Sequence, residues 1–294
     1  MPKWIANYFG EEVGINSTKQ GIFTLHEQYL FSSESSWPKV FLITGGSVSS
    51  GAPGTPASGY TIHQFTTTGP ATFQVSGAPP TFSADLLLVG GGGSGFGGGG
   101  GGVVYHPNIP ITDGTYAVVV GAGGGLVGCN NGTCSPNPTP SGIGQASSFG
   151  PYSIPGGSIN PGAFSPAPLG NQGPGGGSGG PNHDALSRDG GNGTQNSILG
   201  TNYYWGGGGG GGGNNSPGGN GGLGGGGGGG SNNGSGGSGG GSALNTGTNG
   251  GRTGPSTPTS PGGDGGTNTG GGGGGGFGGS RGGPGIVIVR YIAP

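Results

Sequence analysis

The sequence has 294 residues, of which 90 are glycine, and most of the glycines follow Val89. Only 27% of the residues are hydrophobic and 5% are charged, both far below the usage of an ordinary globular domain. The formal net charge of −2 excludes the strongly charged kind of disordered tail, and seven Lys and Arg in all provide no basic patch for nucleic acid or an anionic membrane.

Residues 1–44 differ in composition from the rest of the chain and are predicted to form a docking segment. Thr24 and Glu27 fit a capping box, which predicts a short helix over residues 25–31. The apolar run at 40–43 predicts a strand. A segment this small cannot bury enough surface to be stable alone, so we expect it to complete a larger assembly. The residues assigned to docking are Leu25, Tyr29, Phe31 and Trp37.

Residues 45–58 are rich in Gly, Ser and Pro and predict a linker, after which a glycine-rich domain is expected over residues 59–294. The alternating pattern of Tyr60–Phe65 predicts a strand. Turn residues occupy 66–70, and residues 71–75 are predicted to return as the hairpin partner of the first strand.

Leu86–Val89 is a continuous apolar run, typical of a strand buried on both faces, and Ile286–Ile292 is predicted as a second strongly apolar strand. Residues 103–105 and 116–120 predict two further strands, the second of them after an Asp-Gly turn signal. The two apolar runs bracket the glycine-rich region. If they pair, they tie its two ends together, which favours a folded domain over a flexible linker.

The long glycine runs are Gly97–Gly102, Gly206–Gly213, Gly224–Gly230 and Gly270–Gly276. Such runs are either flexible linkers or polyglycine II helices, which have three residues per turn and no internal hydrogen bonds. Several runs packed side by side can satisfy one another's backbone groups, because no Cβ separates them. Serine is scarce inside the runs and turn-like segments connect them, which favours ordered helices.

The predicted fold is therefore mostly β and irregular. Hairpin or sandwich elements bracket a bundle of polyglycine II helices, preceded by the docking segment with its one short helix.

The candidate binding residues are aromatic. Tyr203, Tyr204 and Trp205 directly precede the longest glycine run and suit either a platform for a sugar or cell surface, or a plug that caps the end of the glycine lattice. His183 lies in a polar cluster flanked by glycine and is grouped with these aromatic residues as a receptor-binding candidate.

Catalysis and cofactor binding have little support. A dinucleotide-binding pattern at residues 93–98 is followed by more glycine and a strand, not by a helix, so no cofactor is expected. No arrangement of nucleophile, base and orienting group is found, and we expect no enzyme activity. Cys129 and Cys134 suit either a local disulfide or two free thiols, and no metal site is expected because no second ligand pair has suitable spacing.

The order of these segments resembles the glycine-rich domain of bacteriophage tail-fibre and adhesin proteins. The resemblance covers about residues 59–294, and the segments that carry it are Tyr60–Phe65, Phe73–Val75, Ala84–Gly93, Gly114–Gly124, Ser147–Gly150 and Gly285–Tyr291. It implies polyglycine II bundles whose variable connecting loops contact the host surface.

A second, shorter resemblance covers residues 21–38, which are similar to an N-terminal segment of virion proteins from marine and cyanobacterial phages. Together the two resemblances imply a non-enzymatic virion protein, displayed at a tail-fibre tip or, alternatively, as a capsid decoration or head fibre. The expected partners are other virion proteins, a host glycan or outer-membrane protein, and further copies of the chain, with a trimer as one form; no nucleic-acid partner is expected. The N-terminus lacks the apolar run of a signal peptide, so we expect assembly in the host cytoplasm.

Overall fold

The computed structural model describes residues 41–95, 97–130, 133–136, 142–159, 189–213, 216–252, 260–276 and 278–294. This part of the chain is mostly β-sheet and extended backbone, without a helix, and so without a helix that could cross a membrane. The helix predicted over residues 25–31, the four docking residues and His183 lie outside these ranges.

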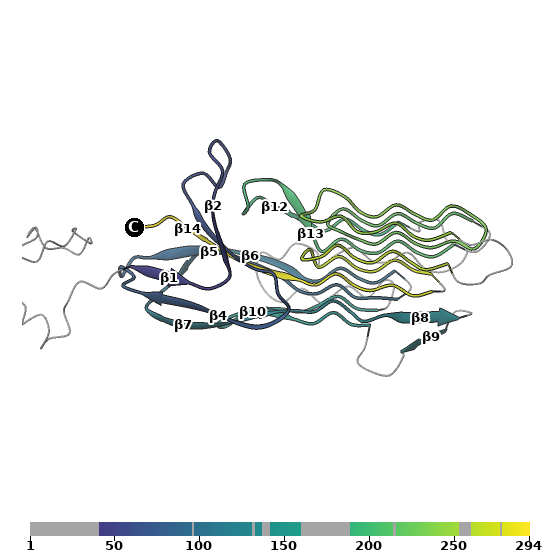
Figure 1. Ribbon diagram of the computed structural model, residues 1–294, viewed down its shortest axis with the longest axis horizontal. Helices are drawn as coiled ribbons and strands as arrows, with labels where there is room; N and C mark the ends of the chain where they lie inside the picture. The colour runs from purple at the N-terminus through teal and green to yellow at the C-terminus, as the bar shows by residue number, and fades with distance from the viewer. Residues whose placement is uncertain are drawn as a thin grey trace, which may run out of the picture.

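Two antiparallel five-stranded sheets form a sandwich at one end of the molecule (Figure 1). Sheet A has the order β1 (Leu42–Thr44), β4 (Gly69–Ser76), β7 (Gly114–Val120), β10 (Ser147–Phe149) and β11 (Tyr152–Ile154). Sheet B has the order β2 (Ser47–Ser50), β3 (Thr61–Phe65), β14 (Ile286–Tyr291), β5 (Ser83–Val89) and β6 (Val103–Pro110). Two separate hairpins pair β8 (Val127–Asn130) with β9 (Thr133–Pro136), and β12 (Thr194–Asn196) with β13 (Tyr203–Trp205).

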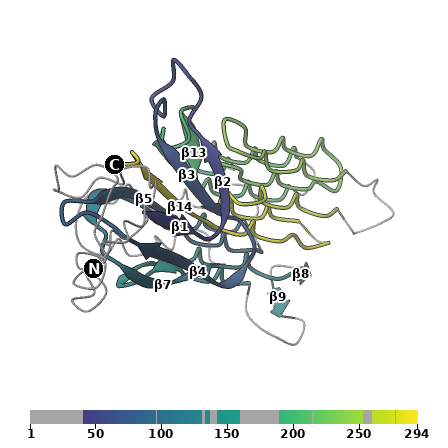
Figure 2. The same ribbon diagram turned by 60° about the vertical axis from the view of Figure 1, so that its left-hand side comes forward.

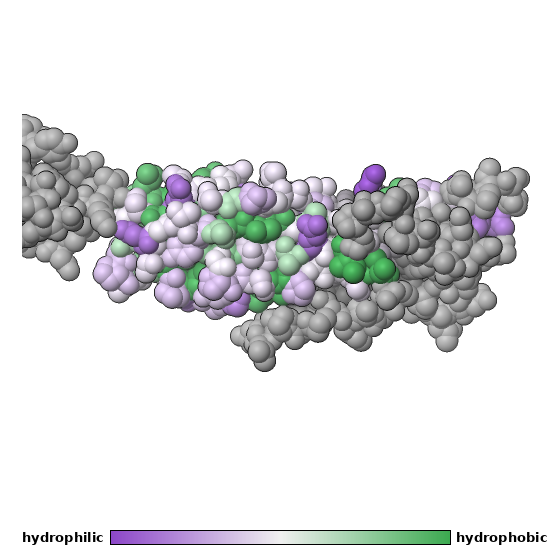
Figure 3. Space-filling view, turned by 90° about the horizontal axis from the view of Figure 1, so that it is seen from below, coloured by the Kyte–Doolittle hydropathy of each residue, from purple (hydrophilic) through white to green (hydrophobic). Residues whose placement is uncertain are grey.

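The main core lies between the two sheets and is rich in aromatic rings. Phe73 of β4 is fully buried, with ring contacts to Phe65 of β3 and to Phe149 of β10. Along β4 and β7 buried and exposed residues alternate, as expected for a sheet with one face in the core. On the solvent side of sheet A, hydrophobic and hydrophilic residues are interspersed (Figure 3).

The central strands of sheet B, β5 and β14, are buried on both faces, which explains the two apolar runs in the sequence. Leu86 and Leu88 of β5 pack into the core between the sheets, whereas Leu87 and Val89 pack on the opposite face. That opposite face is covered by the β12–β13 hairpin, whose Trp205 is fully buried. A strand flanked by apolar layers on both sides needs no polar face.

The two apolar runs do pair in the structure. β14 lies antiparallel to β5, with Ile286 opposite Val89 and Val289 opposite Leu86. Both strands continue directly into glycine runs, one after Val89 and one before Ile286. The pairing therefore holds the two ends of the glycine-rich region together.

The predicted hairpin of residues 60–65 and 71–75 is wrong. β3 pairs with β2 and β14, whereas β4 pairs with β1 and β7, so the two strands lie in different sheets. Each strand finds its partner among residues far away in the sequence. Part of the stretch predicted as a linker also forms β2, an edge strand that follows β1 after a crossing at Gly45 and Gly46. Both glycines have positive φ angles, 120° and 64°, which favour glycine at the point where the chain changes sheet.

The glycine runs extend away from the sandwich side by side, as Figures 1 and 2 show. Successive amides of residues 226–231 donate to three neighbouring segments in turn, and each direction recurs after three residues. The bonds, of 2.7–3.1 Å, run from Gly226 N to Gly222 O, Gly227 N to Gly272 O, Gly228 N to Thr248 O, Gly229 N to Gly219 O, Gly230 N to Gly275 O and Ser231 N to Gly251 O. The runs are therefore packed elements joined by their backbones.

Glycine is required in the centre of this glycine bundle because neighbouring backbones occupy the space where a side chain would stand. A Cβ on Gly228 would overlap the carbonyl oxygen of Gly237, and one on Gly274 would overlap that of Gly228. At the edge of the bundle the requirement ends, and a Cβ on Gly241 would meet nothing within 4 Å.

Polar side chains supply the missing acceptors where an outer run lacks a neighbour. The side-chain oxygen of Asn220 accepts from Ser238 N at 3.0 Å, and that of Asn249 accepts from Gly239 N at 2.8 Å. Four further side chains accept hydrogen bonds from backbone amides in this way: Asp189 from Asn220 N, Asn192 from Leu223 N, Thr248 from Asp264 N, and Asp264 from Arg281 N. We call this set the side-chain acceptors of the bundle.

Candidate functional site

A buried ion pair stands on the outer face of sheet B. Asp85 of β5 and Arg290 of β14 are register partners, and Arg290 Nη2 donates to Asp85 Oδ2 at 2.7 Å. The guanidinium lies 4.4 Å from the centre of the Tyr60 ring, and its Nη1 donates to the carbonyl of Ile198 at 3.2 Å. Arg290 thereby joins two strands of sheet B to the loop between β12 and β13.

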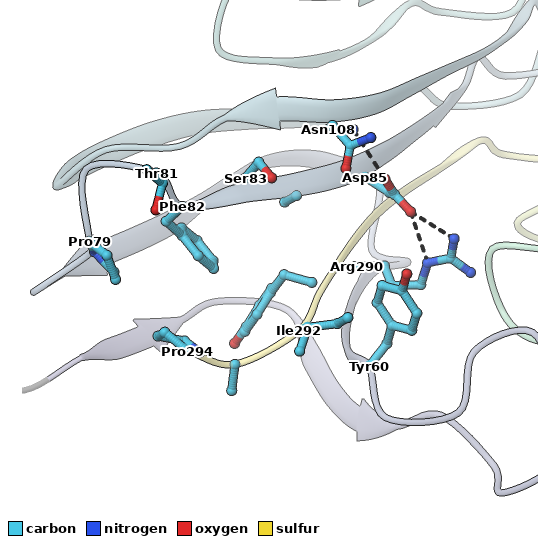
Figure 4. Close-up of a pocket in the computed structure, with 13 residues that line it drawn as sticks. Tyr60, Pro79, Thr81, Phe82, Ser83, Asp85, Asn108, Arg290, Ile292 and Pro294 are labelled. Carbon is cyan, nitrogen blue, oxygen red and sulfur yellow. Dashed lines mark hydrogen bonds and ion pairs between the residues drawn. The ribbon is translucent and has the colours of Figure 1, made fainter. Parts of the chain in front are cut away.

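A cavity of about 280 Å³ adjoins this ion pair (Figure 4). Phe82, Tyr291 and Pro294 line it together with Asp85 and Arg290. Phe41, the first described residue, packs edge-on against Phe82 at a centroid distance of 5.1 Å. The two ends of the described chain therefore meet at the sandwich.

His63 is the most deeply buried titratable group near this end. Its Nδ1 donates to the carbonyl of Gly45 at 2.7 Å, which leaves Nε2 to accept from the Tyr291 hydroxyl at 3.1 Å. Burial lowers the pKa of His63, although the bond to Gly45 acts in the opposite direction. The neutral ring thus links the β1–β2 crossing to β14, which is a structural role.

The predicted aromatic cluster lies at the junction of sandwich and glycine bundle. Trp205 is fully buried among Leu87, Val103 and other apolar residues of the layer between sheet B and the β12–β13 hairpin. Tyr203 and Tyr204 are partly exposed, so a receptor-binding role for them stays a prediction.

A second cavity, of about 380 Å³, lies between β6 and β12 beside this cluster. Its described lining comprises Leu87, Val103, Tyr105, Pro107, Thr194, Gln195 and Asn196. The hydroxyl of Thr194 and the indole nitrogen of Trp205, its partner across the hairpin, are buried without a hydrogen-bond partner. The pKa of Tyr105 is raised, mainly by burial and then by the nearby Asp85 carboxylate.

The end of the bundle opposite the sandwich carries the β8–β9 hairpin (Figure 1). In this hairpin Cys129 and Cys134 are register partners. The Cα atoms of opposed residues in an antiparallel pair are generally ~4.5–5.5 Å apart, which is within the Cα–Cα range of disulfides. The backbone therefore permits a disulfide, while the redox state of the two cysteines stays a prediction. Leu126 and Ile143, at the ends of neighbouring runs, are each 49% exposed.

Neither the ion pair nor the cavity between β6 and β12 was predicted from the sequence. One signal was present: Asp85 and Arg290 each stand within an otherwise apolar strand, where an isolated charge requires a partner. No local sequence pattern indicated the cavity, because its walls come from segments about 90 residues apart. The described residues contain no group of three His, Cys, Asp or Glu side chains that could hold a metal ion.

Comparison with known proteins gives one match. Residues 66–292 match a family model described as a glycine-rich domain. No curated protein and no solved structure matches the chain.

Proposed function

The chain belongs to the family of glycine-rich domains, and from this premise we propose that its glycine runs are polyglycine II helices packed into one bundle. The three-residue recurrence of hydrogen-bond direction along residues 226–231 supports this proposal. Polyglycine II has three residues per turn, so every third amide points the same way. At ~3.1 Å per residue, Gly206–Gly213 then spans about 25 Å.

On the same premise we propose that the protein is a non-enzymatic structural protein of a bacteriophage particle, and that it serves as a tail-fibre or tail-tip adhesin. The resemblance of residues 59–294 to tail-fibre domains motivates the assignment to a phage. In this proposal residues 1–44 attach to other virion proteins, further copies of the chain complete a homo-oligomer, and the loops between the runs recognise a host glycan or outer-membrane protein.

The observation that carries the adhesin proposal is the separation of the two ends of the molecule. Phe41 packs against Phe82 and Tyr291 at the sandwich, whereas the glycine runs extend away from it and reverse at the opposite end (Figure 1). A bundle whose core is backbone has no side chains to offer a receptor, so recognition falls to residues between and beside the runs. Such a body holds the residues between and beside its runs at fixed distances from the attachment end.

Adsorption competition tests recognition. The purified full chain, added to host cells before the phage, is expected to reduce adsorption in a dose-dependent manner, and heat-denatured chain is the control. Full adsorption at a saturating dose of folded chain would overturn the adhesin proposal.

A capsid decoration or head-fibre protein is the alternative, because the same attachment and display geometry suits either position. Immunogold labelling of virions with antibodies against the purified chain separates the two. Labels at the tail tip support the adhesin, whereas labels on the head favour decoration.

A further inference from the structure

We propose that the cavity between β6 and β12 binds one neutral sugar ring of a host-surface glycan. This inference rests on the proposed recognition function and names the class of ligand for a site beside the predicted aromatic cluster. The cavity volume of about 380 Å³ falls in the range of ~300–1,000 Å³ usual for small-molecule sites.

The walls of the cavity differ in chemistry in the way that a sugar requires. Leu87, Val103 and Tyr105 provide an apolar side, and Thr194, Gln195 and Asn196 provide a polar one. A sugar ring has C–H faces that pack on apolar and aromatic surface, and hydroxyls that both donate and accept hydrogen bonds. Amide and hydroxyl side chains match those hydroxyls, since they too donate and accept.

The polar wall retains unused hydrogen-bonding capacity. The Thr194 hydroxyl is buried and has no partner, which is costly unless a ligand or water satisfies it. The side-chain oxygen of Asn196 accepts from Ile198 N at 2.8 Å, so its amide nitrogen is directed elsewhere as a donor. In this proposal a ligand hydroxyl supplies the partner that the Thr194 hydroxyl lacks.

The charge around the cavity favours a neutral ligand. The described residues that line it are uncharged. The nearest ion pair behind Tyr105, Asp85 with Arg290, is internally compensated by its 2.7 Å contact. A phosphate or a carboxylate would find no counter-charge on the walls, whereas a neutral polyol needs none.

The polar wall is held in place by the rest of the fold. Arg290 anchors the loop after β12 through the carbonyl of Ile198, and the buried Trp205 fixes β13. Tyr203 and Tyr204 stand opposite Asn196 and Gln195 in the hairpin, so the partly exposed aromatics belong to the same small element. A preformed site of this kind loses little affinity to ordering.

The test uses the purified full chain on immobilised oligosaccharides that end in glucose, galactose, mannose or N-acetylglucosamine, with sialic-acid-terminated glycans as the charged comparison. Binding is expected for at least one neutral terminus and not for the charged one. The responding oligosaccharide is then titrated against Gln195→Ala and Thr194→Val, both expected to bind about tenfold more weakly through the loss of a hydrogen bond. Gln74→Ala, an exposed glutamine on sheet A, is the matched control and should bind like the unaltered chain.

Thr194→Val also separates binding from folding. It preserves the shape of the side chain and removes a hydroxyl that has no partner, so the variant should unfold at the same denaturant concentration or a higher one. Weaker sugar binding by this stable variant supports the proposal. An absence of any neutral-glycan binding, or equal binding by both cavity variants and the control, overturns it.

Failure of the cavity and failure of the adhesin proposal remain distinguishable. If the chain blocks phage adsorption and both cavity variants block it equally well, recognition stands and the cavity proposal falls. If the chain binds a sugar through the cavity but does not block adsorption, the cavity proposal stands and the adhesin proposal falls.

Discussion

The sandwich and the glycine bundle are stabilised by different parts of the chain. In the sandwich, side chains such as Phe73 and Phe149 fill the space between two sheets, and the backbone pairs only within each sheet. In the bundle, neighbouring backbones occupy the centre themselves, and the runs bond to neighbours in several directions. Substitutions should therefore affect the stability of the two regions in opposite ways: removing side-chain atoms destabilises the sandwich, and adding them destabilises the bundle.

The largest effect is expected from Phe73→Ala in the sandwich. The fully buried ring contacts His63, Phe65, Tyr116 and Phe149, so its removal leaves a cavity and should lower the free energy of unfolding by about 3–5 kcal/mol. Denaturant unfolding followed by near-ultraviolet circular dichroism measures this. Gln74→Ala, the exposed neighbour, should stay within about 0.5 kcal/mol of the original. A small loss for Phe73→Ala would mean that side chains do not hold the sandwich.

The next effect is expected from Gly228→Ala in the bundle. The added methyl group would overlap the carbonyl oxygen of Gly237, so the runs must move apart and the free energy of unfolding should fall by about 1–3 kcal/mol. Gly241→Ala, where the same methyl meets nothing within 4 Å, should stabilise by about 0.4–1 kcal/mol through the unfolded chain. Equal unfolding midpoints for the two variants would contradict a backbone-filled centre.

A smaller effect is expected at the side-chain acceptors. Asn220→Ala leaves Ser238 N without its 3.0 Å acceptor and should cost about 0.5–1.5 kcal/mol. Ser235→Ala is the control, since in that residue the backbone carbonyl, not the side chain, accepts from Gly218 N. Faster amide exchange at Ser238 in the first variant alone would sharpen the assignment. Unchanged exchange there would show that solvent replaces the side chain.

The smallest effect concerns pH and involves the sandwich alone. Because burial lowers the pKa of His63 in the folded state, stability is complete above the ordinary histidine pKa of ~6.5 and declines as pH falls from there towards the lowered value. His106, whose pKa is also lowered by burial, contributes in the same direction. Unfolding midpoints at pH 7.5, 6.5 and 5.5 should decline less in His63→Gln than in the original chain, with His106→Gln as the comparison. Parallel curves for His63→Gln and the original would exclude His63 as a source.

The sequence was informative wherever a local pattern determines burial. The apolar runs at 86–89 and 286–292 identified strands buried on both faces, and their pairing follows from their position around the glycine-rich region. The pattern of 60–65 and 71–75 identified strands but not partners, because alternation specifies which face is buried and not which distant strand lies beside it. β2 escaped notice since its Ser-rich sequence has no apolar period.

Prediction of the candidate site was limited for the same physical reason. Tyr203–Trp205 could be found because three aromatics in a row are unusual in such a sequence. The cavity beside them depends on Tyr105 and Thr194 being brought together by folding. The polar residues of β12 form no sequence pattern that would indicate a binding site.

The three-residue recurrence of hydrogen-bond direction also limits how the glycine runs can change length in evolution. In the proposed polyglycine II geometry, inserting or deleting one codon within a run rotates every later residue of that run by a third of a turn and directs each amide at the wrong neighbour. Gaining or losing three codons preserves all directions and changes only the length. In related bundles, runs should therefore differ in length by multiples of three residues. Two runs that are joined by a connecting turn should change length together.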